Sequence, residues 1–569
     1  MKKLLFQLIL IMTGVTVSSQ IIMDFNGKKY DISKVDSIVF RSIEIPSAAT
    51  CMEKTNEYRI FVEALRRTGL ADSLITNEKG KEYLMNYPED RDGNRLYYPK
   101  RCDVGWTIFA EKDSVFNANG INNFNDLVVK CKEWYGNPSW YDLLTERGIT
   151  VSTGTDYTYE WNVVHIFVAY HIIRAKMAVD EIVYEKTEKN SKYWNYSFGY
   201  EPQAYYETML SGTLVKVWAT DTRNDHFEPS LWLNRYVKNN TLTDQYGTFG
   251  SDAMHPLLYS GAQVDRNSSI ESLNAYIHSI DKLLLYDSNA YYAQHERMRF
   301  HVNQMLPELA TNAIMRATPE HISNLNRGGD GNRVAFPTDF FENLRCYDEK
   351  IILRYNITNY WRALESTQLW GWNKYDFAIR LPHIPTGRYE IRYLYTPFAR
   401  AGEIEFFIGN NSDSISMKKV SNFDATEDPY NGNIGYVTIN PDEGEYGIES
   451  GKTMRLKGYM YAPASYSGGA YNSNTRKLSI TDDDPYIACK KMTGSTSCRT
   501  EGGYGTMTLR FIIGVWDFKQ SQDYWLRIKG RHTAEYNNQE YDDTGWYFSI
   551  IELVPIDVAD NDTYMEDWY

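Results

Sequence analysis

The segment Gly105–Gly120, GWTIFAEKDSVFNANG, changes from an extended to a helical pattern within a few residues. Ile108 and Ala110 belong to an apolar, strand-like run, and the chain becomes charged directly after Ala110. Asp113 is a residue type that favours the start of a helix, and Phe116 follows it at helical spacing. Because the expected strand leads straight into the expected helix, this segment predicts a tight β-to-α corner that packs a sheet against helices.

The length and charge of the chain limit what it can be. A chain of 569 residues favours more than one domain. The 74 acidic residues outnumber the 60 basic ones, and the net charge of −14 argues against a nucleic-acid partner. Aromatic residues make up 15% of the chain and include 46 tyrosines. Tyrosines this frequent either line ligand surfaces or fill the faces of β-sheets.

The first residues predict export. Lys2 and Lys3 precede an apolar run, and the small residues near Ser19 suit cleavage before Gln20. No later stretch reaches the roughly 20 apolar residues of a spanning helix, so no transmembrane span is expected. We therefore expect residues 1–19 to be a signal peptide and the mature protein to be soluble, at the cell surface, in the periplasm or outside the cell.

Patterning divides the remainder of the chain. Residues 20–45 predict a short β-hairpin with a turn at Asn26-Gly27. Helical and strand-like segments then alternate to about residue 315, and the spacing from Met298 to Leu309 favours a helix. A glycine-rich linker is expected at 316–335. Within residues 336–569, the segments 375–381, 389–395, 404–408 and 524–528 show strict period-two alternation, typical of an antiparallel sandwich.

Six cysteines do not form a disulfide scaffold in a chain of this length. Cys489 and Cys498 flank a short polar loop, and we expect them to form a disulfide. Metal signatures and hydrolase motifs are absent from the sequence, so no cofactor is predicted. Calcium has only weak support, from Asp482–Asp484 and from the loop with Asp330 and Asn332. A solvated acidic turn is the alternative for the first, and a linker is the alternative for the second.

Three ordered motifs in the first part resemble the fasciclin (FAS1) family. The family carries a pattern like T-x-F-A-P-T-D-x-A-F at a β-to-α corner, a Tyr-His pair after an apolar helix, and a late strand like N-G-x-I-H-x-I-D-x-V-L-L. The matching positions are Thr107, Phe109, Ala110, Asp113 and Phe116 in the corner, Tyr170 and His171 in the pair, and Asn274, Ile277, His278, Ile280, Asp281 and Leu284 in the late strand. Between the pair and the late strand, Gly212 and Thr213 also resemble the family's central Gly-Thr strand.

This resemblance implies an α+β, FAS1-like wedge with helical insertions in residues 46–315. Because Glu111 and Lys112 replace the usual Pro-Thr, we expect Asp113 or Ser114 to cap the helix. In the family the Tyr-His segment is linked to adhesion, which makes Tyr170 and His171 candidate binding residues. Burial with backbone acceptors is the alternative for His171 and His278.

The second part resembles the galactose-binding-like β-sandwich of carbohydrate-binding modules, with a jelly-roll-like arrangement. The resemblance covers about residues 335–557, including YDFAIRLPHIPTGRYEIRYLYTPFARAGEIEFFIGN. It fixes no binding residue. Our candidates for stacking on sugars are aromatics that we expect in loops, Trp370 and Trp372 in QLWGWN and Tyr466 and Tyr471 in SYSGGAYNSN. Packing inside the sandwich is the alternative for the two tryptophans.

Together these features predict an exported, non-catalytic adhesion or binding protein that recognises a glycan or a surface protein. Bacterial fasciclin-containing proteins of this two-part kind often occur beside outer-membrane glycan-uptake systems, which implies a possible association with such a complex. The alternative is a glycan-active hydrolase that uses the sandwich as its targeting module, since two distant carboxylates leave no sequence motif.

Overall fold

The structure is a computed structural model, and two separate units make up the chain, Met1–Ile45 and Pro46–Tyr569. It describes residues 22–25, 28–31, 46–75, 102–182, 203–220, 230–237, 258–312, 314, 333–347, 352–357, 367–372, 375–395, 403–424, 455–461, 471–472, 477–478, 509–530, 535–536, 539–540, 546–548 and 550–559.

The first unit contains the two strands of the expected hairpin. Strand β1 (Ile22–Phe25) pairs antiparallel with β2 (Lys28–Asp31), and Phe25 lies opposite Lys28. The predicted signal peptide at 1–19 lies outside the described residues.

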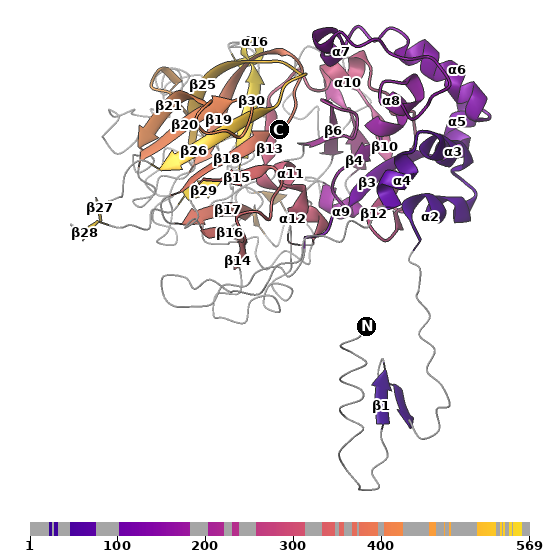
Figure 1. Ribbon diagram of the computed structural model, residues 1–569, viewed down its shortest axis with the longest axis horizontal. Helices are drawn as coiled ribbons and strands as arrows, with labels where there is room; N and C mark the ends of the chain where they lie inside the picture. Colours follow the sequence, from indigo (N-terminus) through magenta and orange to yellow (C-terminus); the bar gives the residue numbers. More distant parts are fainter. Residues whose placement is uncertain are drawn as a thin grey trace. The chain divides into compact units, whose positions relative to one another are not determined.

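The second unit is α+β and begins with helices around an eight-stranded sheet (Figure 1). The sheet has the order β4-β3-β12-β10-β7-β6-β5, with β11 paired to β12. Its strands are β3 (Trp106–Glu111), β4 (Ile172–Ile173), β5 (Gln203–Glu207), β6 (Leu214–Thr220), β7 (Ser230–Leu233), β10 (Ala262–Val264), β11 (Ile270–Glu271) and β12 (Ala275–Ile280); the helices are α2 (Ala48–Thr55), α3 (Arg59–Arg67), α4 (Leu70–Ile75), α5 (Asp113–Ala118), α6 (Phe124–Tyr135), α7 (Asp142–Arg147), α8 (Val163–Tyr170), α9 (Val179–Ile182) and α10 (Ser288–Tyr292).

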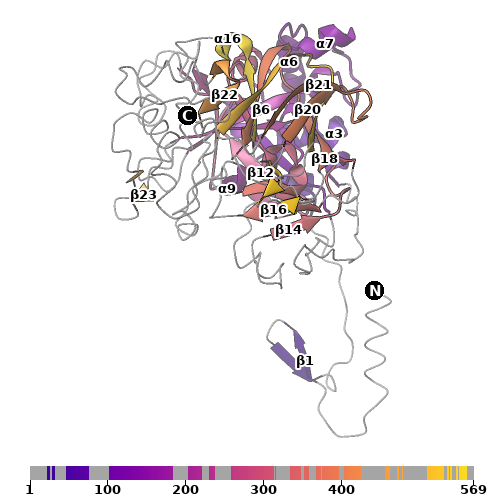
Figure 2. The same cartoon turned by 90° about the vertical axis from the view of Figure 1, so that its left-hand side faces the viewer.

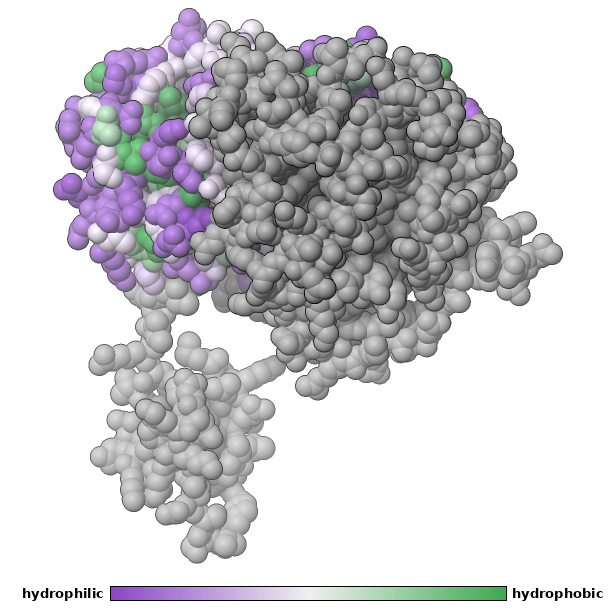
Figure 3. Space-filling model, turned by 180° about the vertical axis from the view of Figure 1, so that it is seen from behind, coloured by the Kyte–Doolittle hydropathy of each residue, from purple (hydrophilic) through white to green (hydrophobic). Residues whose placement is uncertain are grey.

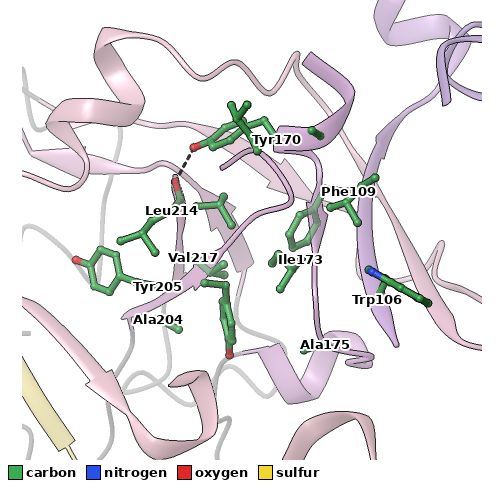
Figure 4. Packing of buried hydrophobic residues seen from close by; sticks show 14 of the residues in the cluster. Trp106, Phe109, Tyr170, Ile173, Ala175, Ala204, Tyr205, Leu214 and Val217 are labelled. Carbon is green, nitrogen blue, oxygen red and sulfur yellow. Dashed lines mark hydrogen bonds between the residues drawn. The ribbon is translucent and has the colours of Figure 1, made fainter. Parts of the chain in front are cut away.

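The predicted corner is present. All six residues of β3 are buried, and α5 begins two residues after the strand ends. Strand β3 pairs in parallel with β12, so Phe109 lies opposite His278, and both are inaccessible to solvent. Figure 4 shows part of the core around Phe109. The strand delivers its apolar side chains to this core, and the helix then turns back over the sheet.

The cap of α5 differs from our prediction. Lys112 occupies the N-cap position, and its side chain forms no cap hydrogen bond. Asp113 instead accepts hydrogen bonds from the backbone N–H of Ile60 at 3.0 Å and from Arg59 Nε at 2.7 Å. The first amides of a helix lack partners within the helix, so the carboxylate of Asp113 stabilises the start of α3 rather than that of α5.

Most of the later strands form three larger antiparallel sheets, several strands of which are labelled in Figure 2. Two of them have five strands each and share a core, where the rings of Phe423 and Phe511 stack 4.2 Å apart. The sheets are β13-β30-β19-β25-β22, β15-β18-β26-β20-β21 and β14-β16-β17-β29. Their strands are β13 (Met298–His301), β14 (Arg333–Phe336), β15 (Leu344–Cys346), β16 (Ile352–Ile357), β17 (Thr367–Trp372), β18 (Asp376–Leu381), β19 (Gly387–Tyr395), β20 (Glu403–Gly409), β21 (Lys418–Asp424), β22 (Tyr459–Tyr461), β25 (Leu509–Phe518), β26 (Tyr524–Gly530), β29 (Trp546–Phe548) and β30 (Ile550–Pro555).

The period-two prediction is confirmed for β20 and β26, where buried residues alternate with more exposed ones. In β18 the predicted inward residues are buried, but Ala378 between them is buried as well. In β19 the predicted outward residues are also buried, so the alternation is wrong there; these residues are Glu390, Arg392 and Leu394.

The helix expected from Met298 is wrong at its start. Residues Met298–His301 form β13, which pairs with β30 near the other end of the chain. Short helices α11 (Val302–Met305) and α12 (Pro307–Thr311) follow.

Further contacts join the sequence before residue 315 to the later sheets. The side chain of Gln520, at the β25–β26 turn, bonds to the backbone of Leu143 and Gly212 and to the hydroxyl of Tyr286. Gly212 has φ +71°, and a Cβ there would lie 2.6 Å from Leu143 Cδ1 and 3.0 Å from the carbonyl oxygen of Gln520. A glycine is therefore required for the turn to approach this closely.

Candidate functional site

The Tyr-His pair is internal. Tyr170 is inaccessible to solvent and donates its hydroxyl hydrogen bond to the carbonyl of Leu214 at 3.0 Å (Figure 4). His171 is equally buried, with Nδ1 at 2.7 Å from the Phe167 carbonyl and Nε2 at 2.9 Å from Glu111 Oε1. A partner would have to open the core to reach either ring. Neither side chain is therefore exposed for the binding role that we predicted.

His278 is likewise buried and bonded. Its Nδ1 lies 2.8 Å from Ser269 Oγ and its Nε2 lies 3.1 Å from the Met177 carbonyl. Burial lowers the pKa of His278 to about 4, so the ring is neutral near pH 7. The positions of His171 and His278 therefore agree with the alternative reading, in which both are buried and bonded to backbone carbonyls.

The aromatic candidates of the second part lie elsewhere than expected. Trp370 and Trp372 belong to strand β17, where Trp370 pairs with Arg354 and Tyr547 in the backbone ladder. Their expected loop position is wrong, because aromatic residues at alternate positions favour a strand. Tyr471 lies in β23 (Tyr471–Asn472), paired with β24 (Lys477–Leu478). Tyr466, Cys489, Cys498, Asp330, Asn332 and the Asp482–Asp484 turn lie outside the described residues.

Exposed rings indicate a different surface. On the described part of the face in Figure 3, hydrophilic residues predominate and hydrophobic ones form small groups. The large apolar or aromatic side chains that are exposed in the described parts are Val129, Tyr159, Tyr259, Leu273, Tyr292, Ile415, Leu456 and Val515. Among these eight, Tyr259 and Tyr292 share a ring neighbour, Tyr236.

We name Tyr236, Tyr259, Tyr291 and Tyr292 the tyrosine platform. Tyr236 begins β8 (Tyr236–Val237) and lies opposite Tyr259 of β9 (Leu258–Tyr259), while the other two end helix α10. The ring centroid of Tyr236 is 5.3 Å from that of Tyr259 and 6.0 Å from that of Tyr292. Tyr236 is buried beneath its neighbours, whereas Tyr292 is 49% and Tyr259 39% exposed.

The platform is held by the start of α10. Asp287 is the N-cap, and its Oδ1 accepts hydrogen bonds from the backbone N–H groups of Asn289 and Ala290. Its Oδ2 accepts from Asn289 Nδ2 at 3.0 Å. Asn289 Oδ1 in turn accepts from the hydroxyl of Tyr236 at 3.2 Å. This chain of bonds fixes Tyr236 before any ligand arrives, which lowers the entropy lost on binding.

One acidic residue reaches the platform from the far end of the chain. Asp557 lies in α16 (Ile556–Ala559), directly after β30, and its Oδ2 is 2.9 Å from His295 Nε2. The ring of His295 stacks on Tyr291 with centroids 6.4 Å apart. Asp557 therefore lies beside one edge of the platform, although it is 262 positions from His295 in the sequence.

Burial and nearby charges also shift the pKa values of two platform tyrosines. Burial and the charges of Tyr259, Asp287 and Tyr292 raise the pKa of Tyr236 to about 12. Burial, followed by the charges of Asp142 and Asp557, raises the pKa of Tyr291. The hydroxyls therefore remain protonated near neutral pH and can both donate and accept hydrogen bonds.

Sequence reasoning missed these four tyrosines, although the doublet Tyr291-Tyr292 was visible. The described residues contain no group of three metal-ligating side chains and no helix long and apolar enough to cross a membrane. The cysteines Cys51, Cys102, Cys131 and Cys346 are free thiols. No family model matches this chain, and no curated protein is similar enough to count as a match.

Proposed function

We propose that this protein is an exported, non-catalytic binding protein that recognises a glycan through the tyrosine platform. The observation that carries the proposal is the pair of exposed rings, Tyr259 and Tyr292, held against a buried third. A sugar ring has apolar C–H faces and polar edges, so it matches a surface with aromatic faces and hydroxyl rims. The predicted signal peptide supports a place at the cell surface, in the periplasm or outside the cell.

We extend this proposal to the fold families. A FAS1-like wedge in the first part is supported by the parallel pairing of β3 and β12, because these two strands carry the corner motif and the late motif. A galactose-binding-like sandwich in the second part is supported by the two facing five-stranded sheets. An association with an outer-membrane glycan-uptake complex would follow from the same proposal.

The test uses the mature chain, residues 20–569, and a panel of soluble polysaccharides. Retardation in affinity electrophoresis measures binding, and the release of reducing ends measures hydrolysis. We expect at least one polysaccharide to be bound and none to be cut. Tyr292→Ala and Tyr259→Ala should each weaken binding about tenfold, since each removes a large part of the contact surface. Tyr159→Ala is the matched control, because Tyr159 is 43% exposed and lies outside the platform.

Three results would contradict this proposal in different ways. Release of reducing ends by the purified protein would favour the hydrolase alternative. Binding that survives both platform substitutions but is lost in Trp370→Ala would move the site to β17. Equal losses in Tyr159→Ala and Tyr292→Ala would show that the platform has no special role.

A further inference from the structure

The two exposed rings of the tyrosine platform are separate contact surfaces. Tyr259 belongs to β9 and Tyr292 ends α10, and the ring of each packs against that of Tyr236. Within the described residues, the rings of Tyr259 and Tyr292 make no contact with each other. Tyr236, which joins them, is only 5% exposed and offers a ligand little surface of its own. A ligand therefore meets two accessible rings that are joined by a buried one.

The size of a sugar unit decides how many units can use these rings. A pyranose is similar in area to a single phenol ring, so one unit can stack on Tyr259 or on Tyr292. Because the two rings meet only through Tyr236, a unit that covers one of them leaves the other open. A ligand that stacks on both rings must therefore contain at least two linked units.

Different polar groups lie beside the two rings. Lys282 Nζ donates to the side chain and the backbone of the two residues that follow Tyr259, at 3.0 and 3.2 Å. An ammonium has three N–H groups, so Lys282 can donate one more bond to a ligand. Near α10, the carboxylate of Asp557 is held by His295 and is 66% exposed, so it can also accept from a ligand. Sugar hydroxyls both donate and accept, which suits a glycan better than an apolar chain.

We propose that the tyrosine platform recognises a linear oligosaccharide segment of two or more linked sugar units rather than a single sugar. This inference rests on the proposed function and adds the length of the ligand to it. One stacked unit gains a single ring contact, which offsets little of the freedom lost on binding. A second unit, linked to the first, makes its contact without another loss of translational freedom, so the affinity rises steeply with length.

The experiment uses the panel polysaccharide that the mature chain binds. Partial acid hydrolysis and size-exclusion chromatography supply its oligosaccharides, from the monosaccharide to the hexasaccharide, and isothermal titration calorimetry gives Kd for each. We expect Kd to fall at least about tenfold between the monosaccharide and the trisaccharide, since the linked second contact is added in this range. Once both rings are covered, further units should change Kd little.

Variants that remove one ring should remove the dependence on length. In Tyr259→Ala and in Tyr292→Ala we expect the hexasaccharide to bind within about threefold of the monosaccharide, because only one stacking position remains. Tyr259→Phe and Tyr292→Phe keep both rings and should keep the dependence on length. Tyr159→Ala is the matched control, because its exposed ring lies outside the platform. Circular dichroism shows whether each variant keeps the fold.

The outcomes separate the two proposals. A monosaccharide that binds the unmodified protein as tightly as the hexasaccharide would overturn the inference and leave glycan binding standing. A dependence on length that persists unchanged in both alanine variants would overturn it as well, since the additional contacts would then lie elsewhere. If no polysaccharide of the panel binds, the proposed function fails and this inference fails with it.

Discussion

Two charged clusters connect the sequence before residue 315 with the later sheets, and they differ in their access to water. The Glu552 cluster (Arg299, Arg392, Arg510 and Glu552) lies along β13, β30, β19 and β25, and each side chain is at most 1% exposed. The His383 cluster (Glu207, Arg380, His383 and Asp523) is partly open, with Asp523 54% exposed.

The Glu552 cluster places one carboxylate among several guanidinium groups. Glu552 Oε1 accepts from Arg299 Nη2 at 2.7 Å, and its Oε2 lies 3.2 Å from Arg510 Nη1. Burial alone would raise the pKa of Glu552, but the surrounding arginines lower it well below its usual range. The carboxylate therefore stays charged, and its contribution to stability does not change near neutral pH.

The His383 cluster joins the same two stretches of sequence through a group that can titrate. His383 Nδ1 lies 2.8 Å from Glu207 Oε1, and its Nε2 lies 3.0 Å from Asp523 Oδ1. Arg380 donates to both oxygens of Glu207. The two clusters should therefore respond differently. Removing a charged member of the Glu552 cluster should destabilise the protein at any pH, whereas the His383 cluster should weaken as the pH rises and His383 loses its proton.

The largest effect is expected for Glu552→Gln. This change leaves the buried arginines without their shared carboxylate, and breaking a buried ion pair typically costs about 3–5 kcal/mol. Urea denaturation should show a loss of this size in the free energy of unfolding. The control is Glu63→Gln, which removes an exposed pair with Arg67 and should change stability by about 0.5 kcal/mol or less. Losses of similar size in the two variants would contradict the role given to burial.

A loss of stability of intermediate size is expected at Gln520, whose uncharged side chain also joins the later sheets to the sequence before residue 315. Gln520→Ala leaves the buried partners of the amide, including the hydroxyl of Tyr286, without their hydrogen bonds. Each buried polar group left without a partner costs about 1–3 kcal/mol, so we expect a loss of about 2–3 kcal/mol in chemical denaturation. Gln522→Ala, on the exposed side of the same turn, should cost far less. A larger loss for Gln522→Ala would show that the turn is not held by Gln520.

Local patterns predicted the elements that local forces determine. The corner at Phe109 and the strands around Ile391 and Phe406 follow from short-range periodicity, and the structure has them where expected. Met298–His301 forms a strand because β30 supplies its hydrogen-bonding partner from about 250 residues away. A window of neighbouring residues holds no information on such a partner, so helical spacing was the better match there.

The tyrosine platform was harder to predict from the sequence than these strands. Its rings come from Tyr236, Tyr259 and the end of α10, and the pairing of β8 with β9 brings the first two together. Tyr291-Tyr292 is visible in the sequence, but tyrosine is too frequent in this chain for a doublet to be informative. Only the exposed fractions distinguish Tyr292 from buried tyrosines such as Tyr170.

The smallest effect is expected for the pH dependence of stability, which His383 should change near neutral pH and Glu552 should not. Burial alone would lower the pKa of His383, but its bonds to Asp523 and Glu207 outweigh burial and raise the pKa to about 9. An unfolded histidine titrates near 6.5. Since the folded pKa is the higher one, the stabilisation is complete below about pH 6.5 and is lost as the pH rises through about 9. At about 1.4 kcal/mol per pKa unit, and with screening at the exposed Asp523, the total is on the order of 2 kcal/mol.

We therefore expect the unmodified chain to lose about 2 kcal/mol in unfolding free energy between pH 6 and pH 9.5 relative to His383→Gln, measured by urea denaturation at each pH. His278→Gln is a control of opposite sign. The folded pKa of His278, about 4, is below the unfolded value, so its pH-dependent loss falls between about pH 6.5 and pH 4. If the unmodified chain and His383→Gln keep a constant difference from pH 6 to pH 9.5, His383 does not bridge the two carboxylates as a cation, and the contrast between the clusters is one of burial alone.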